Sequence, residues 1–595
     1  MTLRLALLAL VAAAGCGGAT TPPSAHRPRS AEGAAQTVRV AASERYRAGR
    51  VHRFFFGGGY RELWKAPVDL PLLDLRRTGG GLTPAGRFGG LQSAVIGFEG
   101  ADGRRYSFRG TDKDPSAVLP ELLLNSPVRN LVQDQMAAQH PGGPIVATAL
   151  SRAAGVLTIR ERMAVMPDDP ALGKYRAEFA GMVGTFYEYP TPAEGDRPGF
   201  AGATAIIGEK KLYPRLARSP DDRVDAKAYL RARLVDLLLG DFDRHRKQWR
   251  WAKIPGRSGW QPIPEDRDQA FVRYDGAGQR LAYVYVPILQ CYGPDYPSMR
   301  GLTLHGWEQD RWLLPELSWR DWEAIVADLK GRLTDEVIEA ALRQLPKAYF
   351  ELDGARLRDD IRGRRDRWLE GGRRFYEHLA GEVNIQATDA TERVHATWTE
   401  GKLWIEVSRL KGAKPYFART FDPAETDEVR IYLRGGNDVV RVTGEPGGIA
   451  LRFIGGDGTG DGPGTGAKTL ADPRGGARFY DIAPDSTVGE GATVVDGDYA
   501  PPPPTSGFLK GIDLPPRDWG YEILPFPNFG FQPGVGFMFG AGLQVSEFGF
   551  RKHPWSRSHK ASASFATGTL LPTVGYSGKY RLENSNLLGT LDVSY

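Results

Sequence analysis

The spacing of apolar residues changes twice along the chain and divides it into three parts. Between residues 45 and 382, short alternating runs give way to runs with helical spacing, which predicts a mixed α+β domain. Ala94–Glu99 and Arg105–Arg109 alternate and are joined by Asp102-Gly103, so they predict a hairpin. Helical spacing predicts helices at Val128–His140, Ala226–Leu239, Trp319–Leu345 and Arg356–Glu382.

Two of these helical runs carry further signals. Thr334-Asp335-Glu336 predicts a helix start, because threonine caps an amino-terminal turn and acidic residues favour that turn. The Arg, Asp and Glu residues of Arg356–Glu382 are interpreted as a solvated face, since alternating charges on a helix rarely form a binding strip.

The second part, residues 383–498, alternates with period two between Gly and Asp turns, which predicts a small all-β domain. A linker over residues 499–518 contains the prolines 501–504. The third part, residues 519–595, alternates large apolar with small or polar residues. It predicts about four strands, among them Val535–Leu543, Ala561–Ala566, Val574–Tyr580 and Leu588–Tyr595.

This last pattern suits strands with one face to lipid and one to a polar lumen. Pro533–Gly536 and Phe548–Pro554 resemble the opening of the barrel domain in the bacterial surface-antigen family, the BamA/TamA group. The resemblance implies the first strands of an antiparallel outer-membrane β-barrel, with the outer membrane and other envelope proteins as partners. A soluble β-sandwich with glycine-rich strands is the alternative.

The strand count conflicts with a complete barrel. A membrane barrel closes with at least ~8 strands, because an open edge cannot face lipid. Four strands therefore predict either a truncated version of a longer protein or several chains that close one barrel together. Truncation is the simpler expectation.

The first residues look like an export signal. Arg4 precedes an apolar run from Leu5 to Ala14, which has the length of a signal segment and is too short to span a bilayer. Ala13–Cys16 resembles a bacterial lipobox, so Cys16 is the predicted lipidation site; an ordinary secretory signal is the alternative. Residues 17–44 are small, polar and proline-bearing and predict a flexible tether.

Composition narrows the function classes. The chain has 595 residues, a net charge of +6 and 25% charged residues. So small a charge on so long a chain argues against nucleic acid as a partner. Cys291 is the single cysteine besides Cys16, so no disulfide framework is expected.

The chemistry-bearing segment follows the helix Ala226–Leu239. Asp243 lies in the next loop, Gln248 comes five residues later, and Asp266 follows after a predicted strand, turn and strand. A phosphotransferase needs this order: a carboxylate to orient a hydroxyl, then an amide and a second carboxylate to hold metal.

Asp243–Trp249 resembles the catalytic loop of the atypical kinases: phosphatidylinositol 4-kinases, HipA, CotH and the secretory-pathway casein kinases. On this resemblance Asp243 orients the acceptor hydroxyl, Gln248 and Asp266 bind Mg²⁺, and ATP is the donor. Asp266 stands five residues before Phe271, as in the phosphoinositide kinases. Gln248 replaces the usual Asn or acidic residue, and Arg267 replaces the usual small glycine.

A kinase also needs a cation for the phosphates and an acidic partner for that cation. Arg109 stands in the strand where a lysine is expected, Lys113 lies just beyond it, and Asp134 is the candidate acidic partner. Gly86–Ser93 is a candidate phosphate-covering loop, although a glycine cluster alone is weakly specific.

Two other interpretations of the acidic loop stay open. Its Asp, Arg and His residues can form a structural salt-bridge network without turnover. A metal-dependent phosphoesterase is the third, but it needs several His and Asp ligands, and His245 stands alone nearby. If the acidic loop is only structural, the domain is instead a non-catalytic binding or assembly module, and the function resides in the barrel.

The all-β part contains two glycine-aspartate segments, Leu433–Val442 and Ile454–Asp461. They echo the calcium-binding nonapeptide repeat, which makes Ca²⁺ a weakly indicated ligand. Two imperfect copies favour ordinary turns between strands instead. Taken together, the sequence predicts an exported outer-membrane protein that carries a kinase-like domain.

Overall fold

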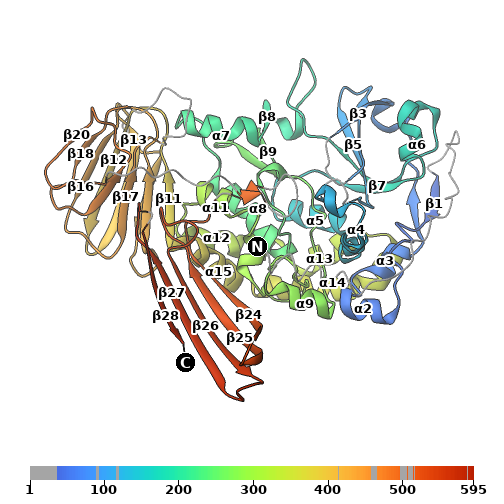
Figure 1. Ribbon diagram of the computed structural model, residues 1–595. Helices are drawn as coiled ribbons and strands as arrows, with labels where there is room; N and C mark the ends of the chain where they lie inside the picture. Colours follow the sequence, from blue (N-terminus) through green and yellow to red (C-terminus); the bar gives the residue numbers. More distant parts are fainter. Residues whose placement is uncertain are drawn as a thin grey trace. The chain divides into compact units, whose positions relative to one another are not determined.

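A computed structural model describes residues 36–88, 93–114, 119–412, 414–456, 466–495, 505–506, 513–514, 516–585 and 587–594. Cys16, most of the predicted tether and prolines 501–504 lie outside these residues. The chain divides into two compact units (Figure 1). The first comprises Met1–Leu379, Ile385–Arg393 and Ile405–Arg419, and the second comprises Ala380–Asn384, Val394–Trp404 and Thr420–Tyr595.

The first unit begins with an antiparallel sheet of five strands in the order β3-β4-β5-β7-β6. The predicted hairpin is confirmed, because Val95–Arg109 and Glu99–Arg105 are the end pairs of its ladder. Ile96, Phe98 and Phe108 are fully buried and form the core of this sheet with Phe186. The strands are β3 (Leu82–Arg87), β4 (Val95–Gly100), β5 (Arg105–Gly110), β6 (Arg162–Val165) and β7 (Val183–Glu188).

The centre of the unit is α8, which runs from Ala226 to Leu239 as predicted. Asp225 caps it by accepting a hydrogen bond from the Ala228 N–H, and Gly240 ends it in the left-handed region with φ 67°. Most of its side chains are buried, so this helix is enclosed on all sides rather than amphipathic. A three-stranded sheet follows: β8 (Ala205–Gly208), β9 (Trp249–Lys253) and β10 (Gln261–Pro264).

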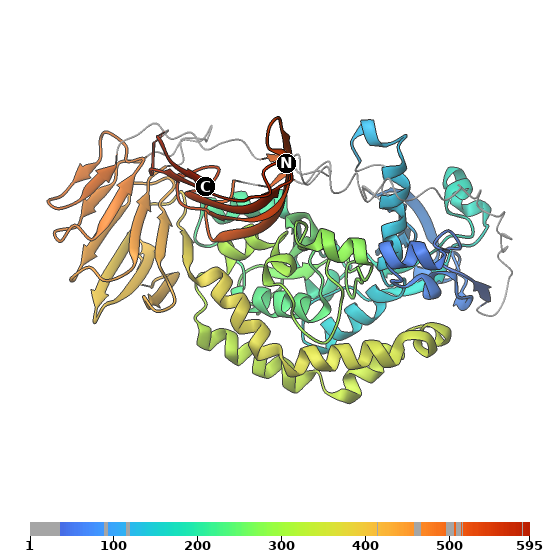
Figure 2. The ribbon, with the colours of Figure 1, turned by 60° about the horizontal axis from the view of Figure 1, so that its bottom comes forward.

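The helical runs are shorter than the periodicity indicates. Trp319–Leu345 forms two helices, and Thr334 caps the second by accepting from the Val337 N–H. Arg356–Glu382 also divides, at Arg367, and its first helix starts earlier (yellow in Figure 2). Val128–His140 becomes one α-helix and a 3₁₀ turn. These elements are α4 (Pro127–Asp134), η4 (Gln135–Ala138), α12 (Trp319–Arg332), α13 (Asp335–Leu342), α14 (Lys347–Asp366) and α15 (Trp368–Ala380).

Short elements complete the described part of this unit, and each connects or covers the sheets. They are β1 (Thr37–Val40), α2 (Arg50–Phe56), α3 (Arg61–Lys65), β2 (Val68–Pro71), η1 (Thr78–Gly80), η3 (Glu121–Leu123), α5 (Gly143–Ala153), η5 (Pro170–Tyr175), α6 (Arg176–Phe179), η6 (Phe200–Gly202), α7 (Glu209–Arg218), η7 (Arg246–Gln248), α9 (Ala277–Tyr283), α10 (Met299–Thr303) and α11 (Trp307–Leu313). In the part of the chain that is described, no helix is both long and apolar enough to cross a bilayer.

The predicted all-β region contains a parallel β-solenoid. Successive strands alternate between two sheets, so that β15, β17, β19 and β21 pair in parallel, and β16, β18 and β20 do likewise. The parallel strands are β15 (Glu428–Tyr432), β16 (Val439–Thr443), β17 (Ala450–Ile454), β18 (Thr469–Ala471), β19 (Ala477–Tyr480), β20 (Thr487–Val488) and β21 (Thr493–Val495). Four strands precede them: β11 (Glu382–Gln386), β12 (Glu392–Thr399), β13 (Lys402–Arg409) and β14 (Phe417–Phe421).

The end of the chain forms an antiparallel sheet of five strands in the order β24-β25-β26-β27-β28. The expectation of about four strands was therefore one too low. The missed strand, β24, contains Pro525 and Pro527, which argue against a strand in a sequence but are tolerated at an edge. The strands are β24 (Tyr521–Gln532), β25 (Gly536–Glu547), β26 (Arg557–Ala566), β27 (Pro572–Arg581) and β28 (Leu588–Ser594), after a short pair β22 (Thr505–Ser506) and β23 (Asp513–Leu514).

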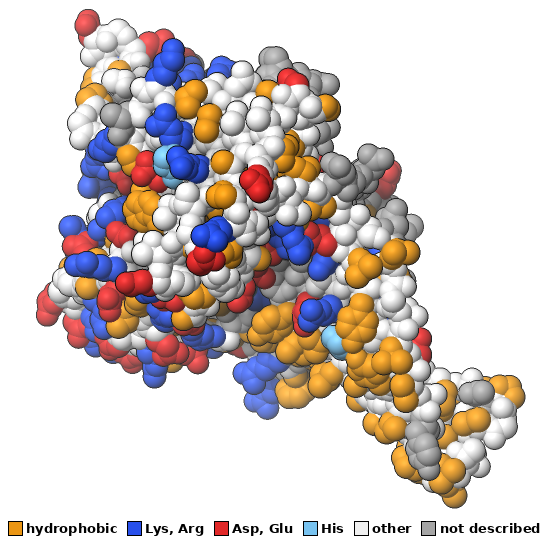
Figure 3. Space-filling model, turned by 90° about the vertical axis from the view of Figure 1, so that its left-hand side faces the viewer, with side chains coloured by type: hydrophobic (Ala, Val, Ile, Leu, Met, Phe, Trp, Pro, Cys, Tyr) orange, Lys and Arg blue, Asp and Glu red, His pale blue; other side chains and the backbone are white. Residues whose placement is uncertain are grey.

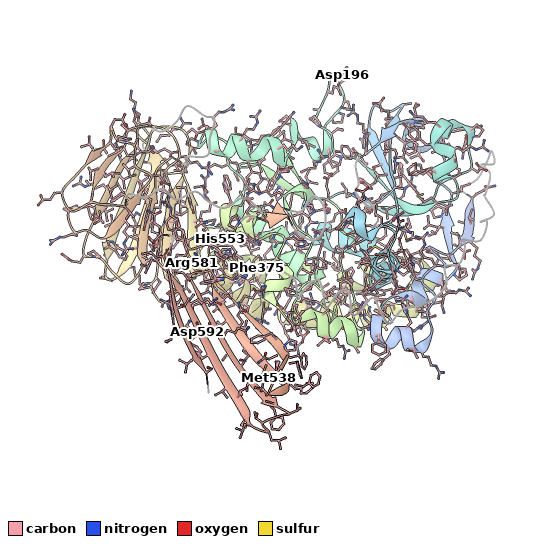
Figure 4. The ribbon with its side chains drawn as sticks, in the orientation of Figure 1. Asp196, Phe375, Met538, His553, Arg581 and Asp592 are labelled. Carbon is pink, nitrogen blue, oxygen red and sulfur yellow. The ribbon has the colours of Figure 1, made fainter. Side chains whose placement is uncertain are left out.

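This sheet has two contrasting faces. The register places large exposed apolar side chains on one face, here called the apolar face (orange in Figure 3). Met538, Arg581 and Asp592, labelled in Figure 4, belong to the opposite, polar face, where serines and glycines are frequent. The apolar face comprises Tyr521, Ile523, Phe529, Phe531, Phe537, Phe539, Leu543, Phe565, Val574, Tyr580, Leu591 and Val593. In the sheet order described, β24 and β28 are separate edges, so the sheet is open.

Candidate functional site

The two acidic motifs meet beside the end of α8. The hairpin of β9 and β10 returns the chain to the Asp243 loop, where the Glu265 N–H donates to the Gln248 carbonyl at 2.9 Å. Arg244 also links the Asp243 loop to the end of β10, because its guanidinium donates to the carbonyl of Glu265 at 2.7 Å. Asp266 follows in the left-handed region with φ 55°, an unusual conformation for a residue with a side chain.

Two cations reach the acidic segment, one from β5 and one from the chain just after it. Arg109, on the third strand of the five-stranded sheet, pairs with Asp266, and Lys113 pairs with Asp268. Burial raises the pKa of Asp266, but the charges of Arg109 and Lys113 bring that pKa well below its usual range. Burial lowers the pKa of Lys113, whose ammonium also lies in the field of Asp266 and Asp243.

Asp243 lies between two histidines. His305 Nδ1 is 2.7 Å from Asp243 Oδ1, and His245 Nε2 is 3.8 Å from the same oxygen. Burial raises the pKa of Asp243, but the hydrogen bond and charge of His305, together with the charge of His245, outweigh this effect and bring the pKa below its ordinary value. The carboxylate is therefore ionised at neutral pH.

Glu161 is a site residue that the sequence did not single out. It lies just before β6, 8% exposed, where its carboxyl group hydrogen-bonds Thr185 and faces the charge of Arg109. Burial raises its pKa to about 7, against the lowering effect of Arg109 and Thr185. Glu161 thus places a buried carboxyl group near Arg109, just before β6.

Arg267, the departure from the usual glycine, belongs to a buried ion network. It pairs with Asp236 and lies 3.2 Å from Asp241 Oδ2, while Arg244 lies 3.5 Å from that oxygen. Burial raises the pKa of Asp241 to about 6, although both arginines lower it. Arg267 therefore compensates acidic residues at the end of α8 and anchors the loop that bears Asp266.

The other predicted site residues lie as follows. The carboxylate of Asp134 accepts from Arg61 at 2.7 and 2.6 Å and lies 2.8 Å from His52, rather than bonding Arg109 or Lys113. Gln248 ends the 3₁₀ turn after Asp243 with a half-buried side chain. Residues 89–92 of the candidate glycine loop lie outside the described residues, as does Cys16.

A cavity borders these charged groups. It is lined by Arg109, Lys113, Glu161, Asp266 and Asp268 together with Trp64, Gln139, His140 and Tyr187. Among the described residues, no group of three or more His, Cys, Asp or Glu side chains is arranged to hold a metal ion.

Comparisons with known proteins give structural neighbours only. No protein-family model matches the sequence, and no curated protein matches it. The Helicobacter pylori proinflammatory kinase CtkA aligns over 49% of this chain and 95% of its own, with 11% identity and a TM-score of 0.29. HipA from a Shewanella oneidensis MR-1 toxin–antitoxin complex covers 49% and 67%, with 12% identity and a TM-score of 0.22.

A third neighbour is the Golgi casein kinase with Mn and ADP bound, which covers 47% of this chain and 71% of its own. Its identity is 12% and its TM-score is 0.22. These neighbours are kinase-like, but at such identities and TM-scores the resemblance carries no argument about function. Any proposal about function therefore rests on the geometry of the site.

Proposed function

We propose that the first unit is a nucleotide-dependent phosphotransferase of the atypical-kinase kind. One observation supports this proposal most strongly: Arg109 and Lys113, which the sequence suggested as phosphate-binding cations, make ion pairs with the segment of Asp266 and Asp268. Asp243, far from both cations in the sequence, contributes to the electrostatic environment of Lys113. In this proposal, Arg109 and Lys113 would bind the phosphates, and Asp243 would orient the acceptor hydroxyl near them.

The proposed chemistry assigns one task to each group. Asp243 orients the acceptor hydroxyl and takes its proton, which requires the ionised form that its lowered pKa maintains. His305 holds one carboxylate oxygen at 2.7 Å and so fixes the direction of the other. Arg109 and Lys113 exchange their carboxylate partners for phosphate oxygens, and Glu161 keeps Arg109 in position.

Asp266 and Gln248 would hold Mg²⁺ beside the phosphates. Mg²⁺ commonly binds through one or two carboxylates, with phosphate and water oxygens completing its octahedron, so this sparse donor set fits the ion only together with a nucleotide. When bound, Mg²⁺ would neutralise charge on the phosphate oxygens. The amide of Gln248 would contribute one neutral oxygen.

Binding and transfer of phosphate from Mg²⁺-ATP test the proposal. Asp266→Asn should weaken Mg²⁺-ATP binding, whereas Asp243→Asn should leave binding in place and remove transfer to protein or small hydroxyl acceptors. Asp196→Asn is a matched control, because this aspartate is exposed at a loop tip (Figure 4) and does not line the cavity. If wild-type protein fails to bind Mg²⁺-ATP, these ion pairs are structural, and a non-catalytic binding module becomes the better description.

We also propose that the sheet β24–β28 contacts lipid, and that the protein is exported to a bacterial outer membrane. The observation that favours this is the apolar face, on which Phe529, Phe531 and Phe537 are each more than half exposed. A contiguous face of this kind is unusual on the surface of a soluble protein, and a polar opposite face suits a lumen. A surface-antigen-type barrel is the finer form of this proposal.

Flotation with phospholipid vesicles tests the lipid contact. Phe539→Asp should reduce the bound fraction, because a charge on the lipid face of a strand is destabilising, by up to ~2–4 kcal/mol for Arg or Lys and by less for Asp. Ser562→Asp is the matched control on the polar face of the neighbouring strand and should bind as wild type does. Equal loss in both variants, or no binding of wild type, would contradict a lipid-facing surface.

A further inference from the structure

A buried ammonium group occupies the turn between β15 and β16. Lys468 Nζ donates to the main-chain carbonyls of Arg434 at 3.1 Å, Gly435 at 3.2 Å and Gly436 at 2.7 Å. It also donates to Asp438 Oδ2 at 2.6 Å. The side chains of Lys468 and Asp438 are 1% and 0% exposed, so this ion pair is closed off from water.

The turn has a backbone shape that gathers oxygen atoms. Arg434 and Gly436 both adopt the left-handed region, with φ 56° and 83°, and three successive carbonyls contact the same ammonium. A left-handed arginine is strained by about 1–3 kcal/mol. Such a turn persists only where its surroundings stabilise it, and the positive charge of Lys468 does so.

Lys468 and Asp438 are neighbours on adjacent coils of the solenoid. Val439 pairs with Thr469 in the parallel ladder, and the Thr469 N–H donates to the Asp438 carbonyl at 2.8 Å. The residue before each strand therefore stands directly beside its counterpart on the next coil. One coil therefore supplies the carbonyl and carboxylate oxygens of this turn, and the next coil supplies the ammonium of Lys468.

We propose that this turn is a cation-binding site filled by the chain's own Lys468, and that it accepts Ca²⁺ when that ammonium is removed. All four partners of the ammonium are oxygen atoms and one is a carboxylate, which is the ligand chemistry of a hard cation. Ca²⁺ takes about 6–8 oxygens at 2.3–2.6 Å, so the turn must tighten slightly and water must complete the shell. The native solenoid accordingly requires no metal at this turn.

Hydrogen exchange of full-length protein, followed in peptides over β15–β18, tests the proposal with Ca²⁺ alone as probe. Wild-type protection should not change between Ca²⁺ and a chelator. Lys468→Met keeps the apolar stem but removes the buried ammonium that pairs with Asp438 and contacts three carbonyls, so protection should fall about a hundredfold or more in chelator. Ca²⁺ at ten times its Kd should then raise protection about elevenfold.

Lys402→Met is the matched control, because Lys402 pairs with Asp422 while 53% exposed; it should lose little protection and ignore Ca²⁺. If Lys468→Met does not fold in chelator, folding on addition of Ca²⁺ is the same positive result. A wild-type response to Ca²⁺ at this turn would overturn the proposal, as would a Lys468→Met variant that Ca²⁺ leaves unprotected.

Discussion

Glu161 offers the sharpest physical test of the site, through the substitution Glu161→Gln. The glutamate is 8% exposed, and burial raises its pKa to about 7 against the opposing effects of Arg109 and Thr185. Glutamine has the same shape and keeps a side-chain oxygen for Thr185, but it does not ionise. The variant therefore removes one titration and little packing.

The direction in which stability changes with pH follows from the raised pKa of Glu161. The folded protein holds the Glu161 proton more tightly than the unfolded chain, so its contribution to stability is fully present below pH 4.5 and is lost as pH rises through about 7. A rise from 4.5 to about 7, at 1.36 kcal/mol per unit, corresponds to about 3 kcal/mol. Wild type should lose this amount relative to Glu161→Gln between pH 4.5 and 8.

Hydrogen exchange in peptides over β5 and β6 measures the local opening free energy at each pH. The difference between variant and wild type should be near zero at pH 4.5 and should reach about 3 kcal/mol in favour of the variant at pH 8. Glu194→Gln, whose side chain is 80% exposed, is the control and should show no such trend. A difference that is equal at both pH values would refute the reasoning.

Three further predictions concern α8 and residues that pair with it or with the loop after it. Arg267→Gly, which restores the residue that kinases usually have, should lower the free energy of unfolding by about 3–5 kcal/mol, because it leaves the buried Asp236 carboxylate undercompensated; denaturant unfolding measures this. Leu238→Ala should cost about 2–5 kcal/mol in the same assay, because this side chain is fully buried. His305→Ala removes the hydrogen bond that lowers the pKa of Asp243, so the acidic limb of a pH–activity profile should move to higher pH; an unchanged limb would exclude Asp243 as the titrating base.

Local patterns predicted the local elements well. Ala226–Leu239 was predicted from helical spacing, and Asp225 and Gly240 supply the cap and the stop that make those bounds definite. The long charged helix was wrong in length, because periodicity continues across the break at Arg367. The strand β24 was missed because its prolines exclude it from a sheet centre but not from an edge.

The residues of the site were predictable only where a motif, or a position relative to one, marks them in the sequence. Asp243 and Asp266 follow a recognisable order, but Glu161 and His305 come from distant segments with no motif around them. Glu161 becomes conspicuous only when β6 and β7 pair, since Thr185 then lies beside Met163 and Arg109. Arg267 illustrates the opposite case. In the sequence it is a departure from the glycine of the kinase pattern, whereas in the structure it pairs with the buried carboxylates of Asp236 and Asp241.

The two edges of the sheet β24–β28 differ in what they offer another strand. At one edge, Pro525 and Pro527 lack N–H donors, so β24 cannot present a complete row of hydrogen-bonding groups. At the other edge, Leu588–Ser594 contains no proline. A strand that extends this sheet, whether from the same chain or another, therefore finds one obstructed side and one receptive side. An added strand should therefore pair with β28 more readily than with β24.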